Sequence, residues 1–447
     1  MRGSLKQEGE AAYLLGEYQF QQFIKSGSEK RFGMEGKMKK VRALILGAGS
    51  RGNAYAAYSR ACPDELEVVA VAEPDPVRRE LFAQRYRIAK EMCFTGWEEA
   101  LAGPKLADAV FVCTLDEMHT APALQALALG YDVLLEKPMS PTEEECIAIE
   151  RAARETGRVL TVCHVLRYTS FFRKIKEMLR EGAVGKTMTI DLIENVGYWH
   201  QAHSFVRGNW RNAEETNPMI LAKSCHDLDI ICWLMEERCE WISSFGSLIH
   251  FTKENQPTGA PDRCLDGCPH AEECVYYAPK IYLTGSTEWP VDVITTDLTP
   301  EGITEALQKG PYGRCVYCCD NNVVDHQVVN MEFAGGGTAS FTMTGFTADL
   351  TRQIKIMGTA GQITADLDKN EILLHRFGEK AAVVVPVPGV QDGFGHGGGD
   401  FGVVQNFIRL VNGEGDNLTS AYASLQSHRM CFAAEKSRKE HCIIKLG

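Results

Sequence analysis

Two groups of residues in the first third of the chain could take part in chemistry. Lys137 stands two residues after an apolar run at residues 132–135, and a glycine-rich turn at residues 47–52 directly follows another apolar run at residues 41–46. If both runs are strands of one parallel sheet, the turn and the lysine lie at the same carboxyl edge, where open α/β sheets bind their ligands. A nucleotide-binding turn beside an amine that exchanges protons predicts redox chemistry on a bound dinucleotide.

The glycine-rich turn has the sequence Gly47-x-Gly49-x-x-Gly52, the spacing of a dinucleotide-binding fingerprint. Glycines at these positions permit a tight turn and let backbone N–H groups approach a pyrophosphate. Glu73 ends the next apolar run, where a carboxylate accepts hydrogen bonds from ribose hydroxyls and repels a 2′-phosphate. The cofactor expected is therefore NAD. NADP is the alternative, because one arginine lies in the turn and another lies shortly after Glu73.

The surrounding sequence predicts the elements that hold these groups in place. From residue 38 to residue 167, continuous apolar runs alternate with helical stretches, which is typical of a Rossmann-type doubly wound parallel sheet covered by helices on both faces. Residues 168–447 contain long β-rich runs joined by glycine turns, which predict an α+β domain with a large, mostly antiparallel sheet. The fold class expected is α/β, with an N-terminal extension at residues 1–37 and a cysteine-rich insertion at residues 252–322.

Composition excludes several classes of protein. The 447 residues carry 47 Lys and Arg against 59 Asp and Glu, a formal net charge of −12, and no basic stripe. This charge makes nucleic acid and anionic membranes unsuitable partners. No apolar run approaches the roughly 20 residues that span a bilayer, and no secretory signal is present, so we expect a cytoplasmic protein with reduced cysteines.

The arrangement of these motifs resembles one known family. The glycine turn, the segment 114–119 after a later apolar run and the tripeptide 136–138, followed by a β-rich domain, are similar to those of the Gfo/Idh/MocA oxidoreductases over residues 38–447. The resemblance implies that hydride passes between a sugar or polyol hydroxyl and NAD, and that Lys137 bonds the substrate oxygen beside the nicotinamide and assists proton transfer. The implied cofactor-binding residues are Gly47, Gly49, Ser50, Arg51, Gly52, Glu73, Thr114, His119, Glu136 and Lys137.

A second catalytic group is expected on the helix that enters the second domain. Members of this family often carry an aspartate one turn before a histidine, and this chain has His226 but Ala222 in place of the aspartate. Lys223 stands beside that alanine, where its charge would suit an anionic substrate. The catalytic residues expected are therefore Lys137, His226 and Lys223, with His226 as general acid or base. The alternative for His226 is a structural histidine of the core.

A polar and aromatic loop at residues 198–211 precedes this helix, where substrate would approach. Aromatic faces stack on sugar rings, and His and Arg side chains bond hydroxyl or acid groups. The alternative is a loop buried against a second copy of the chain. With residues at the domain junction and in a C-terminal glycine-rich loop, the substrate-binding residues expected are His164, Arg167, Tyr168, Trp199, His200, His203, Trp210, Arg211 and His396.

Cysteines cluster in the insertion. Four thiolates, at Cys264, Cys268, Cys274 and Cys315, would suffice to hold a tetrahedral structural zinc and so stabilise a segment with little apolar core. The spacing is not that of paired Cys-x-x-Cys knuckles, so free thiols are an equal alternative.

Three functions are compatible with these features. The first is an NAD-dependent sugar or polyol oxidoreductase with Lys137 and His226 as acid–base groups. The second is an NAD-dependent glycoside hydrolase that oxidises the sugar transiently, eliminates the glycosidic group, adds water and reduces the product again, with Lys223 stabilising an enolate. The third is a regulator that senses NAD without catalysis. An antiparallel sheet with one uncovered face also predicts a homo-oligomer, a dimer or a tetramer.

Overall fold

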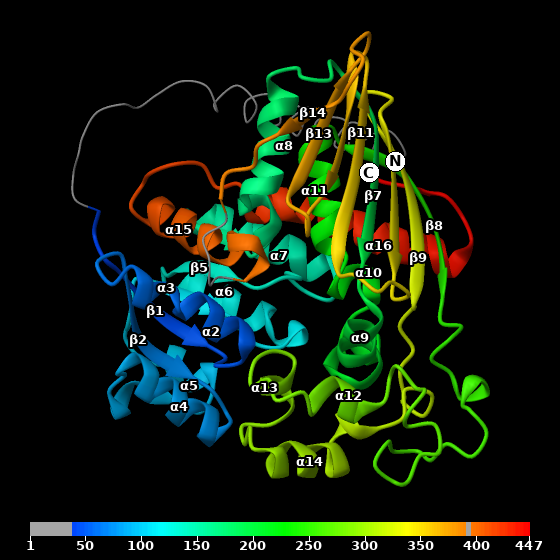
Figure 1. Cartoon of the computed structure of the whole chain (residues 1–447). Helices are drawn as coiled ribbons and strands as arrows, with labels where there is room; N and C mark the ends of the chain where they lie inside the picture. Colours follow the sequence, from blue (N-terminus) through cyan, green and yellow to red (C-terminus); the bar gives the residue numbers. More distant parts are fainter. Residues whose placement is uncertain (1–37, 390–394) are drawn as a thin grey trace, which may run out of the picture.

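The computed structural model describes residues 38–389 and 395–447, so the predicted extension at residues 1–37 lies outside the described residues. Figure 1 shows two sheets, a smaller one formed by the first part of the chain and a larger one formed by the second part, with helices packed between them. Within the described ranges, no helix is long and apolar enough to cross a membrane.

The first sheet has six parallel strands in the order β3-β2-β1-β4-β5-β6. Ala43 and Ile45 of the central strand pack in one apolar cluster, whereas Leu44 and Leu46 pack in another, so both faces of the sheet are covered. The predicted doubly wound parallel sheet is therefore confirmed. The strands are β1 (Val41–Leu46), β2 (Leu66–Ala72), β3 (Cys93–Phe94), β4 (Ala109–Val112), β5 (Asp132–Leu135) and β6 (Leu160–Val162).

Helices connect these strands, and local sequence sets where they begin. Asp75 starts one helix by accepting hydrogen bonds from the N–H groups of Val77 and Arg78. Thr142 starts another by accepting from the N–H of Glu145. The helices are α2 (Ser50–Ala56), α3 (Tyr58–Ala61), α4 (Pro76–Tyr86), α5 (Trp97–Leu101), α6 (Thr120–Ala128) and α7 (Glu143–Thr156).

The second sheet has nine strands in the order β14-β13-β12-β11-β7-β10-β9-β8-β15. All neighbours are antiparallel except β7 and β10, which run parallel, so the predicted mostly antiparallel sheet is confirmed. The strands are β7 (Thr187–Asn195), β8 (Cys239–Ser247), β9 (His326–Phe333), β10 (Thr338–Thr344), β11 (Thr351–Gly358), β12 (Gly361–Asp366), β13 (Glu371–Arg376), β14 (Val383–Val385) and β15 (Ile444–Lys445).

Long helices cover one face of this sheet and link it to the first sheet. Figure 1 shows α8 (Ser170–Arg180), α11 (Cys225–Met235) and α16 (Ala421–Glu440) behind the strands, and their apolar residues share one core with the sheet. α15 (Gly399–Val411) instead returns to the first sheet, where the Phe407 ring meets Phe111 of β4. The chain thus crosses between the two sheets more than once, and the crossing segments meet near the end of β5.

The predicted cysteine-rich insertion lies between β8 and β9. It contains α12 (Ala278–Tyr282), α13 (Val291–Ile294) and α14 (Pro300–Lys309), and seven buried residues around Tyr282 form a small core of its own. In Figure 1 it lies below α9 (Tyr198–His200), with α13 on the side of the first sheet. The insertion therefore reaches the region where the first sheet presents its ligand-binding edge.

Candidate active site

The glycine-rich turn between β1 and α2 leaves room for a dinucleotide at one position and none at the other two. Gly47 has φ +95°, and a Cβ there would stand 2.5 Å from the Cys113 carbonyl oxygen. A Cβ on Gly52 would stand 2.0 Å from the Gly47 carbonyl oxygen, so both glycines are needed for the turn itself. A Cβ on Gly49 meets nothing within 4 Å, which leaves open the side from which a pyrophosphate approaches.

Glu73 is buried at the end of β2 and is tied to this turn. One carboxylate oxygen accepts the N–H of Ala48 at 2.8 Å, and the other accepts the N–H of Asp75 at 3.0 Å. Each oxygen keeps a second lone pair, so the carboxylate can also accept hydrogen bonds from ribose hydroxyls. The turn and this carboxylate together fit a dinucleotide.

Arg51 of the glycine turn bridges two carboxylates. Its Nε donates to Glu136 at 2.6 Å, and its two Nη atoms donate to Asp400 at 3.1 and 2.6 Å. Burial opposes ionisation of Asp400, but nearby positive groups, Arg51 first, outweigh it and hold the pKa of Asp400 well below its ordinary value. Arg51 therefore joins the turn, the end of β5 and α15, and its charge is engaged without a 2′-phosphate.

Lys137 extends from the end of β5 towards the second domain. Its Nζ donates a hydrogen bond of 2.6 Å to the Ala222 carbonyl at the end of α10 (Met219–Ala222). His119 supports the turn that follows: its Nδ1 lies 2.7 Å from the Pro138 carbonyl oxygen, and its Nε2 lies 3.1 Å from that of Thr114. Since both nitrogens of His119 face protein carbonyls, this imidazole fixes the shape of the edge that carries the lysine.

His226 lies on α11, one turn after the carbonyl that binds Lys137. It is 5% exposed, and no group in the described part of the chain bonds its Nδ1. Burial, helped by the charge of Lys137, lowers the pKa of His226 well below its ordinary value. The imidazole is therefore neutral near pH 7 and able to accept a proton, and its unpaired nitrogen lacks the partner that buried polar atoms usually have.

Lys223 lies beside a buried ion network. Its Nζ is 3.4 Å from Glu194 of β7, and Arg352 of β11 bonds the same carboxylate at 2.6 Å and Asp227 of α11 at 2.7 Å. Burial would raise the pKa of Glu194, but Arg352 and Lys223 outweigh it and hold that pKa at about 2. Burial lowers the pKa of Lys223, against the attraction of Glu194. Lys223 is thus a partly desolvated cation in the electrostatic neighbourhood of Lys137.

Two predicted substrate residues, Trp199 and His200, lie on α9. Burial and then the charge of Lys223 lower the pKa of His200 well below its ordinary value. Trp289 of the insertion packs against this pair, with its ring centroid 5.3 Å from that of Trp199 and 5.0 Å from that of His200. Trp289 is 41% exposed, so this aromatic cluster keeps a free surface.

Two further predicted substrate residues flank His226. The ring centroid of His164 lies 5.8 Å from that of His226, and the centroid of His396 lies 6.1 Å from it. His396 also contacts Asp400, so it belongs to the cluster around Arg51 as well.

The remaining predicted substrate residues bond protein groups, which favours a supporting role in the walls of the site. The pairs are His203 with Tyr282 (2.9 Å), Trp210 with Asp116 (3.2 Å), Arg211 with Asp320 (2.8 Å), Arg167 with Asp229 (2.6 Å) and Tyr168 with Thr419 (3.0 Å).

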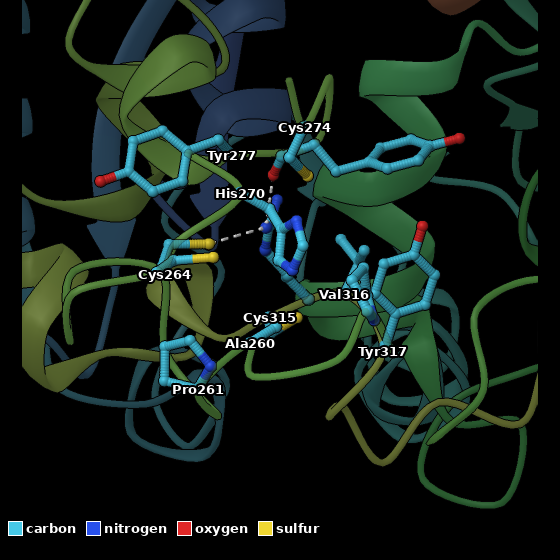
Figure 2. A pocket seen from close by; sticks show the side chains of 13 residues that line it. Ala260, Pro261, Cys264, His270, Cys274, Tyr277, Cys315, Val316 and Tyr317 are labelled. Carbon is cyan, nitrogen blue, oxygen red and sulfur yellow. Dashed lines mark hydrogen bonds between the residues drawn. The ribbon is translucent and has the colours of Figure 1, made fainter. Parts of the chain in front are cut away.

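The four cysteines predicted to bind zinc line one small pocket of the insertion (Figure 2). Among the residues that the structure describes, no group of three or more His, Cys, Asp or Glu side chains could hold a metal ion. The buried Arg207 donates to the Cys264 sulfur at 3.6 Å, and burial raises the pKa of Cys315 to about 12. The predicted zinc site is therefore not supported among the described residues. None of the 16 cysteines forms a disulfide in the described part of the chain.

Comparison with known families agrees with this geometry. The profile described as "Oxidoreductase family, NAD-binding Rossmann fold" matches residues 41–164, and the one described as "Oxidoreductase family, C-terminal alpha/beta domain" matches residues 176–446. The chain belongs to the Gfo/Idh/MocA oxidoreductases. The predicted family is therefore confirmed, and the chain is an enzyme of this family.

Known members differ widely in sequence from this oxidoreductase. It is 24% identical to the Bacillus subtilis protein YteT, named as an oxidoreductase, over 354 residues that cover 75% of this chain and 80% of YteT. It is 25% identical to the 2,7-anhydro-N-acetylneuraminate hydratase of Escherichia coli over 148 residues, 33% of this chain and 39% of the hydratase. The WlbA dehydrogenase from Chromobacterium violaceum, solved with NADH and UDP-GlcNAcA, is 17% identical with a TM-score of 0.63, and the match covers 92% of this chain and 96% of WlbA. At that identity the structural likeness establishes the fold.

Five residues of the site were not predicted. Each of them contacts a partner far along the chain, which local sequence does not reveal. They are Asp116, Glu194, Trp289, Arg352 and Asp400.

We expect acid to destabilise this oxidoreductase steeply, because five of its histidines are buried with lowered pKa values. In the unfolded chain these imidazoles titrate near pH 6.5. Below about pH 6.5, the unfolded state therefore binds protons that the folded state does not bind. The free energy of unfolding should fall as the pH drops from about 6.5 towards 3, by up to about 1.4 kcal/mol per pH unit for each histidine. The five are His164, His200, His203, His226 and His428, of which His203 and His428 have pKa values of about 3.

Urea unfolding at a series of pH values measures this slope. His428→Gln should make it shallower by about one proton, whereas His375→Gln, at an exposed position of β13, should leave it unchanged. Equal unfolding free energies at neutral pH and at about pH 5 would contradict the expectation.

Proposed function

We propose that this enzyme is an NAD-dependent oxidoreductase that acts on a hydroxyl of a sugar or polyol, with Lys137 and His226 as its acid–base groups. The observation that carries the proposal is the meeting of the two sheets at one contact. Lys137, at the ligand-binding edge of the first sheet, reaches the Ala222 carbonyl, and buried His226 with its unpaired nitrogen follows one turn later. A substrate hydroxyl between the amine and the imidazole would satisfy that nitrogen.

Each of the two groups has a distinct role in this mechanism. When bound, NAD supplies the acceptor for the hydride that leaves the substrate carbon. Neutral His226 accepts the hydroxyl proton, while the Lys137 ammonium donates a hydrogen bond to the oxygen and stabilises the charge that develops on it. The lowered pKa of His226 favours this assignment, since a protonated imidazole could not act as the base.

The substrate class is supported by the aromatic cluster and by one relative. Trp199 and Trp289 offer ring faces of the kind that stack on sugars, beside the polar atoms of His200. The structurally similar WlbA dehydrogenase was solved with NADH and a sugar nucleotide.

A redox-neutral glycoside hydrolase is the second candidate. It is favoured by Lys223, a desolvated cation where an enolate would need stabilising, and by the likeness to a hydratase of an anhydro sugar. In that reaction the hydride would return to the sugar after elimination and addition of water, with no net change of NAD.

One assay separates these functions. The purified enzyme is mixed with NAD and a panel of sugars, polyols and aryl glycosides, and NADH absorbance and aglycone release are followed together. Net NADH without aglycone supports the oxidoreductase, and aglycone without net NADH supports the hydrolase. Neither signal, with NAD bound, would contradict both and favour a regulator.

Replacing Lys137 by Ala should lower kcat by about 10²–10⁴-fold, because the acid–base group and its hydrogen bond to the oxygen are both lost. The affinity for NAD should change little, since the Lys137 amine bonds only the Ala222 carbonyl among the described residues. Steady-state kinetics and a binding titration measure the two effects. Lys369→Ala, an exposed lysine after β12, is the control. Unchanged turnover in Lys137→Ala would contradict its assignment.

Replacing Glu194 by Gln should move the basic limb of the pH–rate profile to lower pH. Glu194 is the main group that favours the charged form of Lys223, so its loss lowers the pKa of Lys223 further, and the charge disappears at a lower pH. The profile of kcat/KM against pH measures the shift. Asp191→Asn, on the same strand but bonded to Ser340, is the matched control. A basic limb that stays in place would show that the charge of Lys223 is not used.

Replacing Trp289 by Ala should raise KM for the sugar about tenfold and change kcat little, because the loss of a stacking face weakens binding in the ground and transition states alike. Kinetics with the substrate found in the panel measure the effect. Phe377→Ala, an exposed aromatic residue after β13, is the control. An unchanged KM would place the sugar away from the insertion.

We also propose that the open face of the large sheet binds a second copy of the chain. Ile193, Thr342, Val328 and Phe245 pair in register across four neighbouring strands, and the three apolar members are 39%, 39% and 57% exposed. An apolar row of this kind on an exposed sheet is typical of an interface.

A further inference from the structure

Four imidazoles form a row through the active site. The ring centroids of His396 and His226 are 6.1 Å apart, those of His226 and His164 are 5.8 Å apart, and those of His164 and His428 are 5.5 Å apart. The row leads from the half-exposed His396 to three buried members. Only one end of the row therefore has access to solvent.

The buried end of the row offers no exit for a proton. His428 is fully used, because its Nε2 accepts the N–H of Met139 and its Nδ1 donates to the Ser424 carbonyl. Burial lowers the pKa of His164 well below its ordinary value, so a proton does not rest there. A proton that reaches His226 must leave on the other side.

His396 has the orientation that proton transfer requires. Its Nδ1 lies 3.1 and 3.2 Å from the two carboxylate oxygens of Asp400, a buried group whose pKa is held well below its ordinary value, so Nδ1 donates to it. This leaves Nε2 as the nitrogen that accepts protons. The His396 side chain is 39% exposed, so water can take a proton from it.

The backbone conformation at His396 indicates that its imidazole is held in a defined position. Its φ is +52°, in the left-handed region that residues other than glycine seldom adopt. Such a conformation is strained and is held by its surroundings, and strain of this kind is common at functional sites. Asp400 holds the His396 side chain in place, since it bonds both this imidazole and Arg51.

The proposed oxidation creates a need for this exit. When an alcohol becomes a ketone, the C–H bond gives up a hydride to NAD, and the O–H bond gives up a proton while its electrons form the carbonyl. His226 accepts that proton, yet it is 5% exposed and faces the positive charges of Lys137 and Arg352. His396 is the neighbouring imidazole on the solvent side, with its ring centroid 6.1 Å from that of His226.

We propose that His396, held by Asp400, is a proton-transfer residue that takes the substrate proton from His226 and passes it to solvent. This role rests on the proposed oxidation and replaces simple substrate binding as the function of His396. Asp400 is a positioning residue. The groups that face His396 are Asp400, with Arg51 behind it, and His226, with Lys137, His164 and Arg352 behind it.

Rescue by buffer tests the proposal. In dilute non-coordinating buffer, His396→Ala should lower kcat at least about tenfold, because proton release becomes limiting. Added imidazole should restore it in a saturable manner, since a small base can occupy the vacated space and carry the proton. His396→Gln, which keeps the volume, should be slow and less responsive to imidazole. His375→Ala, an exposed histidine on β13, should match the wild type at every buffer concentration.

Several results would contradict the proposed role of His396. A His396→Ala enzyme with a raised KM and a normal kcat, or one equally slow at all imidazole concentrations, would make His396 a substrate ligand or a structural residue and overturn the proposal. Full activity in dilute buffer would overturn it as well.

A second measurement does not depend on turnover. Exchange of the His226 ring N–H with solvent, followed by NMR on histidine-labelled enzyme, should slow in His396→Gln and stay unchanged in His375→Ala. If wild type shows no net NADH in the panel assay, the proposed oxidation fails, and this exchange still decides the proton route. Unchanged exchange in His396→Gln would reject the route.

Discussion

A partly buried arginine joins the three segments that form the edge of the active site. Arg51 comes from the glycine turn, Glu136 follows β5 and precedes Lys137, and Asp400 lies in the first turn of α15. A guanidinium fork satisfies both carboxylates at once, which offsets the cost of removing three charges from water. Removing Arg51 would leave two buried carboxylates without compensation, a loss of the kind that typically costs about 3–5 kcal/mol. The contacts of Arg51 therefore fix the glycine turn, Lys137 and α15 relative to one another.

The second domain repeats this arrangement on the other side of the lysine. Arg352 bonds Glu194 and Asp227, and Lys223 lies against the same carboxylate. Two arginine networks thus flank the contact between Lys137 and the Ala222 carbonyl, and histidines fill the space between them. In this setting burial and neighbouring cations both oppose protonation of imidazoles. The histidines therefore remain in the neutral form, which can accept a proton, because the charged groups around them are already paired with one another.

The parts of this site that were predicted are those that local pattern determines. Apolar runs and glycine spacing gave the first sheet, and the rule that ligands bind at the carboxyl edge placed Lys137 beside the turn. Contacts between residues far apart in the chain could not be predicted from the sequence. Arg51 and Asp400 are 349 residues apart, and nothing near Trp289 indicates that it packs on Trp199. The zinc prediction was unsupported for a related reason, since cysteine spacing does not reveal that Arg207 donates a hydrogen bond to the Cys264 sulfur.

The alanine at position 222 explains why the proton route differs from that of a simple Asp–His pair. A carboxylate beside His226 would raise its pKa and hold the proton there. Here position 222 offers only a backbone carbonyl, which orients Lys137 at any pH and attracts no proton from the imidazole. The carboxylate that bonds a histidine of this row belongs instead to His396. The carboxylate that bonds a histidine of this row therefore lies at the exposed end, beside His396, and not beside His226. A proton accepted at His226 is stabilised electrostatically when it moves outward to His396.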